Sequence, residues 1–237
     1  MRAFIRRCYL DFVNMRYLFL APVVITLVIV PFMIWTTMIT SWTAGDSLIV
    51  VRRMAGNIEM IVPLSSLFWN LAIYDKYFRS GLKENILLYG VGKTCILQSF
   101  VNLALFGVCL SVTYMTFYHY FPVVETILGE WYKTMTQAFF LNAVAYAGSF
   151  VLQHYLYGFI AAFSYYMSFM FFNLSGKYSI FCGENLYKID PLPMRAVNNA
   201  LIYGTVLYVI GYAANRIYTR KKGGLQLLKA KIKGAQR

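Results

Sequence analysis

The chain is poor in charged side chains, and this shortage bounds the class of protein. Only 13% of its 237 residues are Asp, Glu, Lys or Arg, whereas 59% are hydrophobic. Globular domains carry about twice that share of charge, so this chain could not cover a water-facing surface. Its solvent must be mostly lipid. We therefore expect an all-α polytopic membrane protein that forms a single transmembrane domain over residues 1–237.

Residue patterns for catalysis and metal binding are also lacking. The only histidines, His119 and His154, stand in no HExxH or Ser/His arrangement, and the four cysteines form no CxxC pair or Cys/His cluster. Residues 90–94 imitate a phosphate-binding loop, but Leu87 stands where that loop requires glycine. Residues 174–177 imitate an ABC signature, yet they fall outside the membrane on the expected topology. We expect neither an enzyme nor a cofactor or metal in this chain.

Long apolar runs are present instead, and the first of them, residues 18–40, is long enough to cross a ~30 Å hydrocarbon core. One stretch of 43 residues, between Lys133 and Lys177, carries no Asp, Glu, Lys or Arg. As a single helix it would reach about 64 Å, so it must fold into two spans. The likeliest turn lies at Gln153–Gly158. The sequence thus predicts six transmembrane helices, at about 18–40, 58–74, 94–118, 134–154, 157–175 and 199–214.

The segments that flank these spans have expected roles of their own. Residues 1–17 alternate basic and apolar side chains at helical spacing, which predicts an amphipathic interfacial helix. Residues 119–133 are expected to connect spans three and four. Residues 176–198 are expected to form a re-entrant outer segment before span six, and 215–237 a basic cytosolic tail that follows the 18–214 bundle. The prolines of span one are tolerated if neighbouring helices satisfy the carbonyls that they free.

Basic residues are distributed unevenly between the two sides of this topology. Of the 22 Lys and Arg, 16 fall on the side of the two termini and 6 on the other. The acids divide 3 against 6, so the whole net charge of +13 lies on the terminal side. Because Lys and Arg stay cytoplasmic, both termini are expected in the cytosol. The charge excess is explained by topology, and no nucleic-acid partner is needed.

The stretch between spans two and three, residues 75–93, is the most informative. Ser80 and Gly81 can begin a helix, Glu84 suits its positive end, and Gly90 can end it. Residues 82, 86 and 89 then share an apolar face. A short mixed helix at the cytosolic surface would be a docking element for a soluble partner; the alternative is an ordinary solvated loop.

At these residues the chain resembles the type-2 ABC exporter permeases, whose pattern is approximated by Asp75, Lys76, Gly81, Glu84, Leu87, Leu88, Gly92 and Lys93. It departs from the pattern in its leading Asp, where Glu is commoner, and in lacking a proline after Leu88. The resemblance covers nearly the whole chain in layout and about twenty residues as a motif. It implies a bacterial plasma-membrane permease that pairs with a second permease subunit and docks separate ABC ATPase subunits, which would hold ATP and Mg.

In such a permease the ATPase contacts a coupling helix and, more weakly, the turn between spans four and five. The implied coupling residues here are Gly81, Leu82, Lys83, Glu84, Asn85, Ile86, Tyr89, His154 and Tyr155. Uncharged polar residues of the spans could line a substrate path or simply join helices by hydrogen bonds: Asn70, Gln98, Asn102 and Asn142.

The implied cargo is a hydrophobic or amphipathic molecule, with a toxin-like or antimicrobial peptide favoured. Two rivals stay open. One is a non-transporting membrane scaffold or immunity protein, and the other is a secondary carrier. A carrier is disfavoured because such proteins commonly keep ionisable residues inside the membrane. The expected spans offer only His154, at a turn, and Glu59, which stands at the start of span two and is counted with the connection before it.

Overall fold

The computed structural model describes residues 17–41, 56–59, 61–78, 92–120, 124–172, 180–181 and 191–235. Within these ranges every regular element is a helix, which confirms the expected all-α class. Short helical pieces at 56–59 and 61–65 lead into α5. The remaining elements are α2 (Tyr17–Val24), η1 (Ile25–Ile29), α3 (Val30–Ser41), α5 (Leu67–Phe78), α7 (Gly92–Tyr120), α8 (Val124–Val151), α9 (Tyr155–Phe172) and α10 (Pro191–Ala235).

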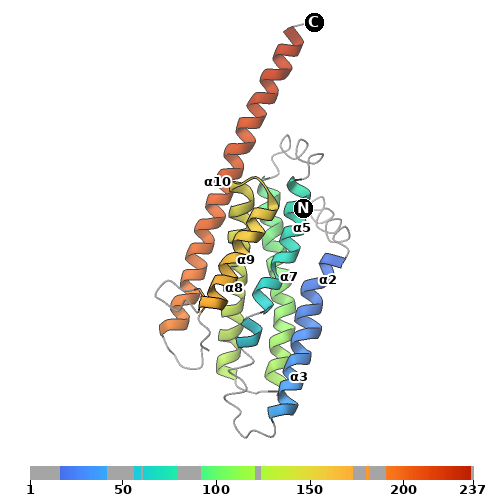
Figure 1. Ribbon diagram of the computed structural model, residues 1–237, viewed down its shortest axis with the longest axis vertical. Helices are drawn as coiled ribbons and strands as arrows, with labels where there is room; N and C mark the ends of the chain where they lie inside the picture. Colours follow the sequence, from blue (N-terminus) through green and yellow to red (C-terminus); the bar gives the residue numbers. More distant parts are fainter. Residues whose placement is uncertain are drawn as a thin grey trace.

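Successive helices run in alternating directions along one bundle axis (Figure 1). We call the end at which α8 turns into α9 the turn end. The end at which α7 finishes and α8 begins is the opposite end. Helix α5 finishes at the turn end, and α10 continues well past the other helices there (Figure 1). The chain therefore enters α8 and α10 from the opposite end and leaves α5, α8 and α10 at the turn end (Figure 1).

The first apolar run forms one continuous rod of α2, η1 and α3. In its π-helical middle, the backbone N–H of Val30 bonds the carbonyl of Ile25. The next donor in this register would be residue 31, a proline, which has no N–H. The carbonyl of Thr26 is instead satisfied by the hydroxyl of Thr113 on α7, at 2.6 Å. A neighbouring helix thus replaces the missing bond, as the sequence analysis required.

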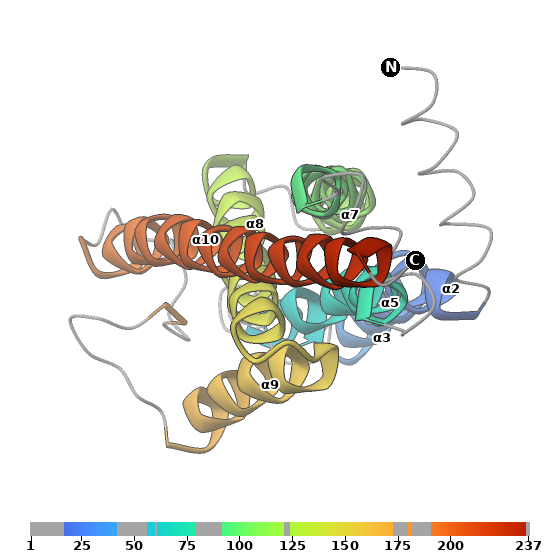
Figure 2. The ribbon, with the colours of Figure 1, turned by 90° about the horizontal axis from the view of Figure 1, so that it is seen from above.

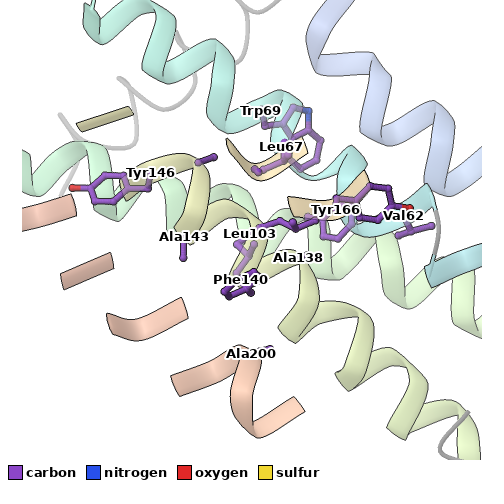
Figure 3. Packing of buried hydrophobic residues seen from close by; sticks show 14 of the residues in the cluster. Val62, Leu67, Trp69, Leu103, Ala138, Phe140, Ala143, Tyr146, Tyr166 and Ala200 are labelled. Atoms are coloured by element: carbon purple, nitrogen blue, oxygen red, sulfur yellow. The ribbon is translucent and has the colours of Figure 1, made fainter. Parts of the chain in front are cut away.

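Helix α8 is the centre of the bundle. It contacts α5, α7, α9 and α10, and α10 crosses over it with α9 alongside (Figure 2). The core gathers on its small and aromatic side chains, where side chains from the neighbouring helices meet them (Figure 3). Buried residues of this core include Leu103, Ala138, Phe140, Ala143, Tyr146, Tyr166 and Ala200.

Two glycines allow this close packing around α8. A Cβ on Gly158 of α9 would lie 2.1 Å from the carbonyl oxygen of Ala145, and one on Gly211 of α10 would lie 2.6 Å from the ring of Tyr146. Such distances are far inside van der Waals contact. Only glycine lets these backbones approach, which is how helices associate when lipid offers no hydrophobic drive between them.

The outward-facing surface is apolar. Among the described residues, three helical segments are long and apolar enough to cross a membrane: Leu20–Thr37, Cys95–His119 and Met194–Tyr218. Only 22%, 44% and 33% of them, respectively, is buried. Their exposed side chains include Val28, Phe32, Met115 and Val209. In water such a surface would drive aggregation, so the chain is a membrane protein.

Several expected boundaries need correction. Helix α8 begins at Val124, so residues 124–133 belong to a helix and not to a connection. Helix α10 begins at Pro191, which takes the last part of the expected 176–198 segment into the helix. It then continues to Ala235, so most of the basic tail is helical. The expected interfacial helix (described only from residue 17) and the coupling helix at 80–90 lie outside the described residues.

Candidate functional site

One face of α5 and of the residue before it is polar and buried. Ser66, Asn70, Tyr74 and Tyr77 recur at helical spacing, and each hydrogen-bonds to a side chain of a surrounding helix. We call this row and its partners the seam. From residue 66 to residue 77 it covers about 17 Å of helix, more than half of a ~30 Å hydrocarbon core. A buried polar row of this length is the most unusual feature of the bundle.

Three asparagines form the middle of the seam. The amide of Asn102 donates to Asn70 at 2.8 Å, and the amide of Asn70 donates to Asn142 at 2.6 Å. Asn142 in turn donates to the hydroxyl of Ser66 at 2.7 Å and to the carbonyl of Ala138 at 2.8 Å. All three are at most 1% exposed. They join α5, α7 and α8 in one directed chain of hydrogen bonds.

Towards the turn end the seam changes partners. The hydroxyl of Tyr74 lies 2.6 Å from that of Ser99 on α7. One turn further, Tyr77 donates to Asn215 of α10 at 2.9 Å. The ring of Tyr77 also packs edge-on against Phe150 near the end of α8, with ring centroids 5.0 Å apart. The last turn of α5 is thus fastened to both α8 and α10.

At the opposite end the seam is continued by charged groups. The ammonium of Lys133 lies 3.0 Å from the carboxylate of Glu59 and 2.8 Å from that of Glu130. The amide of Gln137 donates to the other oxygen of Glu59 at 2.5 Å. All four residues are at least 97% buried. We call this group the clasp; breaking a buried ion pair of this kind costs about 3–5 kcal/mol.

The clasp also reaches the chain that follows α9. The amide of Gln137 makes a second, longer contact of 3.4 Å with the carbonyl of Ile180. Ile180 and Phe181 are buried, and the ring of Phe181 lies 5.1 Å from that of Phe169 on α9. The clasp therefore ties together three segments far apart in sequence: residues 56–59, the first half of α8, and residues 180–181.

The turn between α8 and α9 is exposed and locally well defined. Gln153 adopts a left-handed conformation with φ of 58°, and the N–H of His154 bonds the carbonyl of Ser149. This is the hydrogen bond of a Schellman helix end. The ring nitrogen Nδ1 of His154 then accepts from the N–H of Leu156 at 3.2 Å and caps α9. His154 stacks on Tyr155, with centroids 5.1 Å apart.

The residues expected to line a path are brought together in part. Asn70, Asn102 and Asn142 contact one another, and Gln98 lies buried one turn before Asn102 on α7. The three asparagines therefore join α5, α7 and α8 by hydrogen bonds. His154 and Tyr155 lie at the turn, as expected. The other coupling residues, from Gly81 to Tyr89, lie outside the described residues.

Sequence reasoning missed the clasp. It placed Glu130 and Lys133 in a connection and counted Glu59 with the same side of the membrane, so it expected no ionisable residue inside the bundle apart from His154. A signal was present: Glu130, Lys133 and Gln137 stand at i, i+3 and i+7, one face of a helix. No pattern in the chain points from these residues to Glu59.

No known protein family, curated protein or solved structure matches the chain. Among the described residues, no group of three His, Cys, Asp or Glu is placed to hold a metal ion. The functional reading therefore depends on the geometry of the seam, the clasp and the turn.

Proposed function

We propose that the chain is the six-span permease subunit of an ATP-driven exporter in a bacterial plasma membrane, with both termini in the cytosol. The observation that carries this proposal is the position of α5. Its polar face forms the seam, and its last residues, 75–78, are the beginning of the expected coupling stretch at 75–93. A force applied to residues 79–91 would therefore act on α5 and on every hydrogen bond that it makes.

The second expected ATPase contact lies at the same end of the bundle. The turn at residues 152–154 follows Phe150, whose ring packs against Tyr77 and Phe78 at 5.0 and 5.2 Å. Helix α10 leaves the bundle at this end and continues as a helix to Ala235. Both docking segments would thus be presented to one soluble partner, which is what a motor beneath the bundle needs.

The mechanism follows from linkage. A partner ATPase that holds ATP and Mg would close as a dimer and move the docked segments of two permease subunits. If the closed ATPase binds one arrangement of α5 better than another, ATP shifts the permease toward that arrangement. The seam would be the part that rearranges. The cargo that best suits an apolar bundle is hydrophobic or amphipathic, and a peptide is our preferred class.

The test is co-purification with a soluble ATPase encoded beside the gene for this chain. We expect Glu84→Arg or Leu82→Asp to abolish co-purification while membrane insertion survives. A matched control is Glu125→Arg, the same charge change near the start of α8, at the opposite end of the bundle. It should leave ATPase binding intact. Binding that survives both coupling variants would refute the docking assignment.

The clasp favours a second candidate, an ion-coupled secondary carrier. Buried ionisable groups inside a membrane bundle commonly mark the coupling site of such carriers, and Glu59, Glu130 and Lys133 are such groups. The two candidates differ in their energy source. A carrier would need no ATPase partner, so the absence of any co-purifying ATPase, with the chain intact and inserted, would favour it.

A further inference from the structure

We infer that the clasp is the outer closure of the seam: Lys133, held between Glu59 and Glu130, seals the asparagine chain from water on that side of the membrane. The inference deepens the proposed function and rests on it in one respect, the assignment of this end of the bundle to the outer side of the membrane. The seal itself rests only on the described contacts. The clasp joins three segments at the opposite end of the bundle, and Glu59 precedes Ser66, the first residue of the seam, in the chain.

The position of the clasp is the first reason. Glu59 lies two helical turns before Ser66 in the chain, and Gln137 lies one turn before Leu141 and Asn142 on α8. The clasp and the asparagine chain therefore follow one another along α8 and along the chain that leads into α5. Water entering from the opposite end between these elements would have to pass Glu59, Lys133 and Gln137 before it reached Asn142.

The chemistry of the clasp is the second reason. Apolar side chains could seal a helix bundle permanently, and buried ion pairs are seldom more stable than such a replacement. Charged groups differ because each of them is well solvated once water reaches it. An ion-pair closure is therefore stable while water is excluded, and it costs little free energy to keep open once water has entered. An apolar closure lacks the second property.

A third observation concerns Gln137. Its side-chain oxygen is buried and has no hydrogen-bond partner among the described residues. A buried acceptor without a partner weakens the closed arrangement, and entering water would satisfy it. The contact of 3.4 Å between Gln137 and the carbonyl of Ile180 is also the longest in the clasp. We expect the 180–181 segment to separate first when the closure opens.

The test is the rate at which one buried cysteine reacts with a membrane-impermeant, positively charged methanethiosulfonate. The full chain, with its four native cysteines replaced by alanine, carries Ser66→Cys as the reporter. The reagent is applied to spheroplasts, which present the outer face, and separately to inside-out vesicles. With the clasp intact, we expect slow reaction from the outer face, because residue 66 is buried.

Lys133→Met should raise the rate from the outer face by at least about tenfold, since removing one partner of a buried pair strongly destabilises the closed form. Glu59→Gln, which preserves shape, should raise it less, in the same direction. Tyr77→Phe removes a hydrogen bond at the other end of the seam and is the matched control; it should leave the outer rate unchanged. Thermal melting in detergent identifies variants that are folded.

Unchanged labelling in folded Lys133→Met and Glu59→Gln would overturn the inference. Equal increases from both faces would also overturn it, because they would show that the whole bundle has loosened. An increase seen only in inside-out vesicles would support the seal but reverse the topology, and so would contradict the proposed exporter orientation. The failure of the seal and the failure of the proposed function are therefore separate results.

Discussion

The two ends of α8 differ in how their polar groups are satisfied. Near its start, Glu130 and Lys133 are fully polar yet almost completely buried, and their partners are other side chains. At its finish, Gln153 and His154 lie in an open turn, where the backbone ends the helix by its own hydrogen bonds. One end is closed by the contacts of Lys133 and Gln137 with Glu59, which are long-range and depend on the whole fold. The other is built locally and leaves its surface free for a partner.

This difference teaches where the bundle can move. Local turns survive when neighbouring helices shift, because their hydrogen bonds lie within a few residues. The contacts of Lys133 and Gln137 with Glu59 cannot survive such a shift, since Glu59 comes from a segment that is far from α8 in the chain. A rearrangement of α5 would therefore leave the turn intact and break the clasp. The middle of α8, where Asn142 bonds Asn70 and Ser66, lies between these extremes.

The largest effect is expected from removing the only cation of the clasp, which tests the difference between the two ends of α8 most directly. Lys133→Met leaves Glu59 and Glu130 buried beside an apolar side chain, and we expect the free energy of unfolding to fall by about 3–5 kcal/mol. The measurement is thermal or denaturant unfolding in detergent. Replacing Glu59, Glu130 and Lys133 together by apolar residues should recover most of this loss. If Lys133→Met is as stable as the parent, the ion pairs of the clasp contribute nothing to the free energy of unfolding.

The next largest effect is expected in the middle of the helix. Asn142→Leu removes the acceptor of Asn70 and the donor to Ser66 at once, so we expect a loss of about 1–3 kcal/mol. Combining it with Asn70→Leu should cost less than the sum of the two single changes, because a shared network is removed only once. Additive losses in this double-mutant cycle would show that the two asparagines do not act together.

Tyr77→Phe should have a smaller effect, about 1 kcal/mol, because it leaves the buried Asn215 oxygen without its donor but keeps the ring packing on Phe150. Tyr77→Leu is the informative companion, since it also removes the aromatic contact. We expect the leucine variant to lose more stability in the same unfolding assay. If both variants lose equally, the hydrogen bond and not the ring fastens α5 at the turn end.

The sequence was sufficient for the helical class and for most helix positions. The uncharged stretch after Lys133 had to turn once to fit a membrane, and the turn formed at Gln153 and His154 within the expected range. The same reasoning handled Pro31 correctly, because a proline in a buried helix must leave a carbonyl for a neighbour to satisfy. These features follow from length, charge and the chemistry of single residues.

The clasp could not be found in this way, because it depends on which distant segments meet. Membrane sequences are read on the assumption that charges mark the ends of spans, and Glu130 and Lys133 were placed in a connection for that reason. The assumption fails when an acid and a base neutralise each other inside the bundle. The asparagines were recognised as polar members of spans, but only the fold decides that they bond to one another.

The smallest expected effect concerns the open turn, where the structural role and the docking role of His154 can be separated. His154→Ala removes the cap of α9 and should cost about 0.5 kcal/mol, whereas His154→Asn restores a side-chain acceptor at the same position. Both variants should therefore fold, and the asparagine variant should melt with the parent. ATPase co-purification then distinguishes the roles. If His154→Asn binds the ATPase as well as the parent does, the turn acts through its backbone shape; if binding falls while melting is unchanged, the imidazole itself contacts the partner.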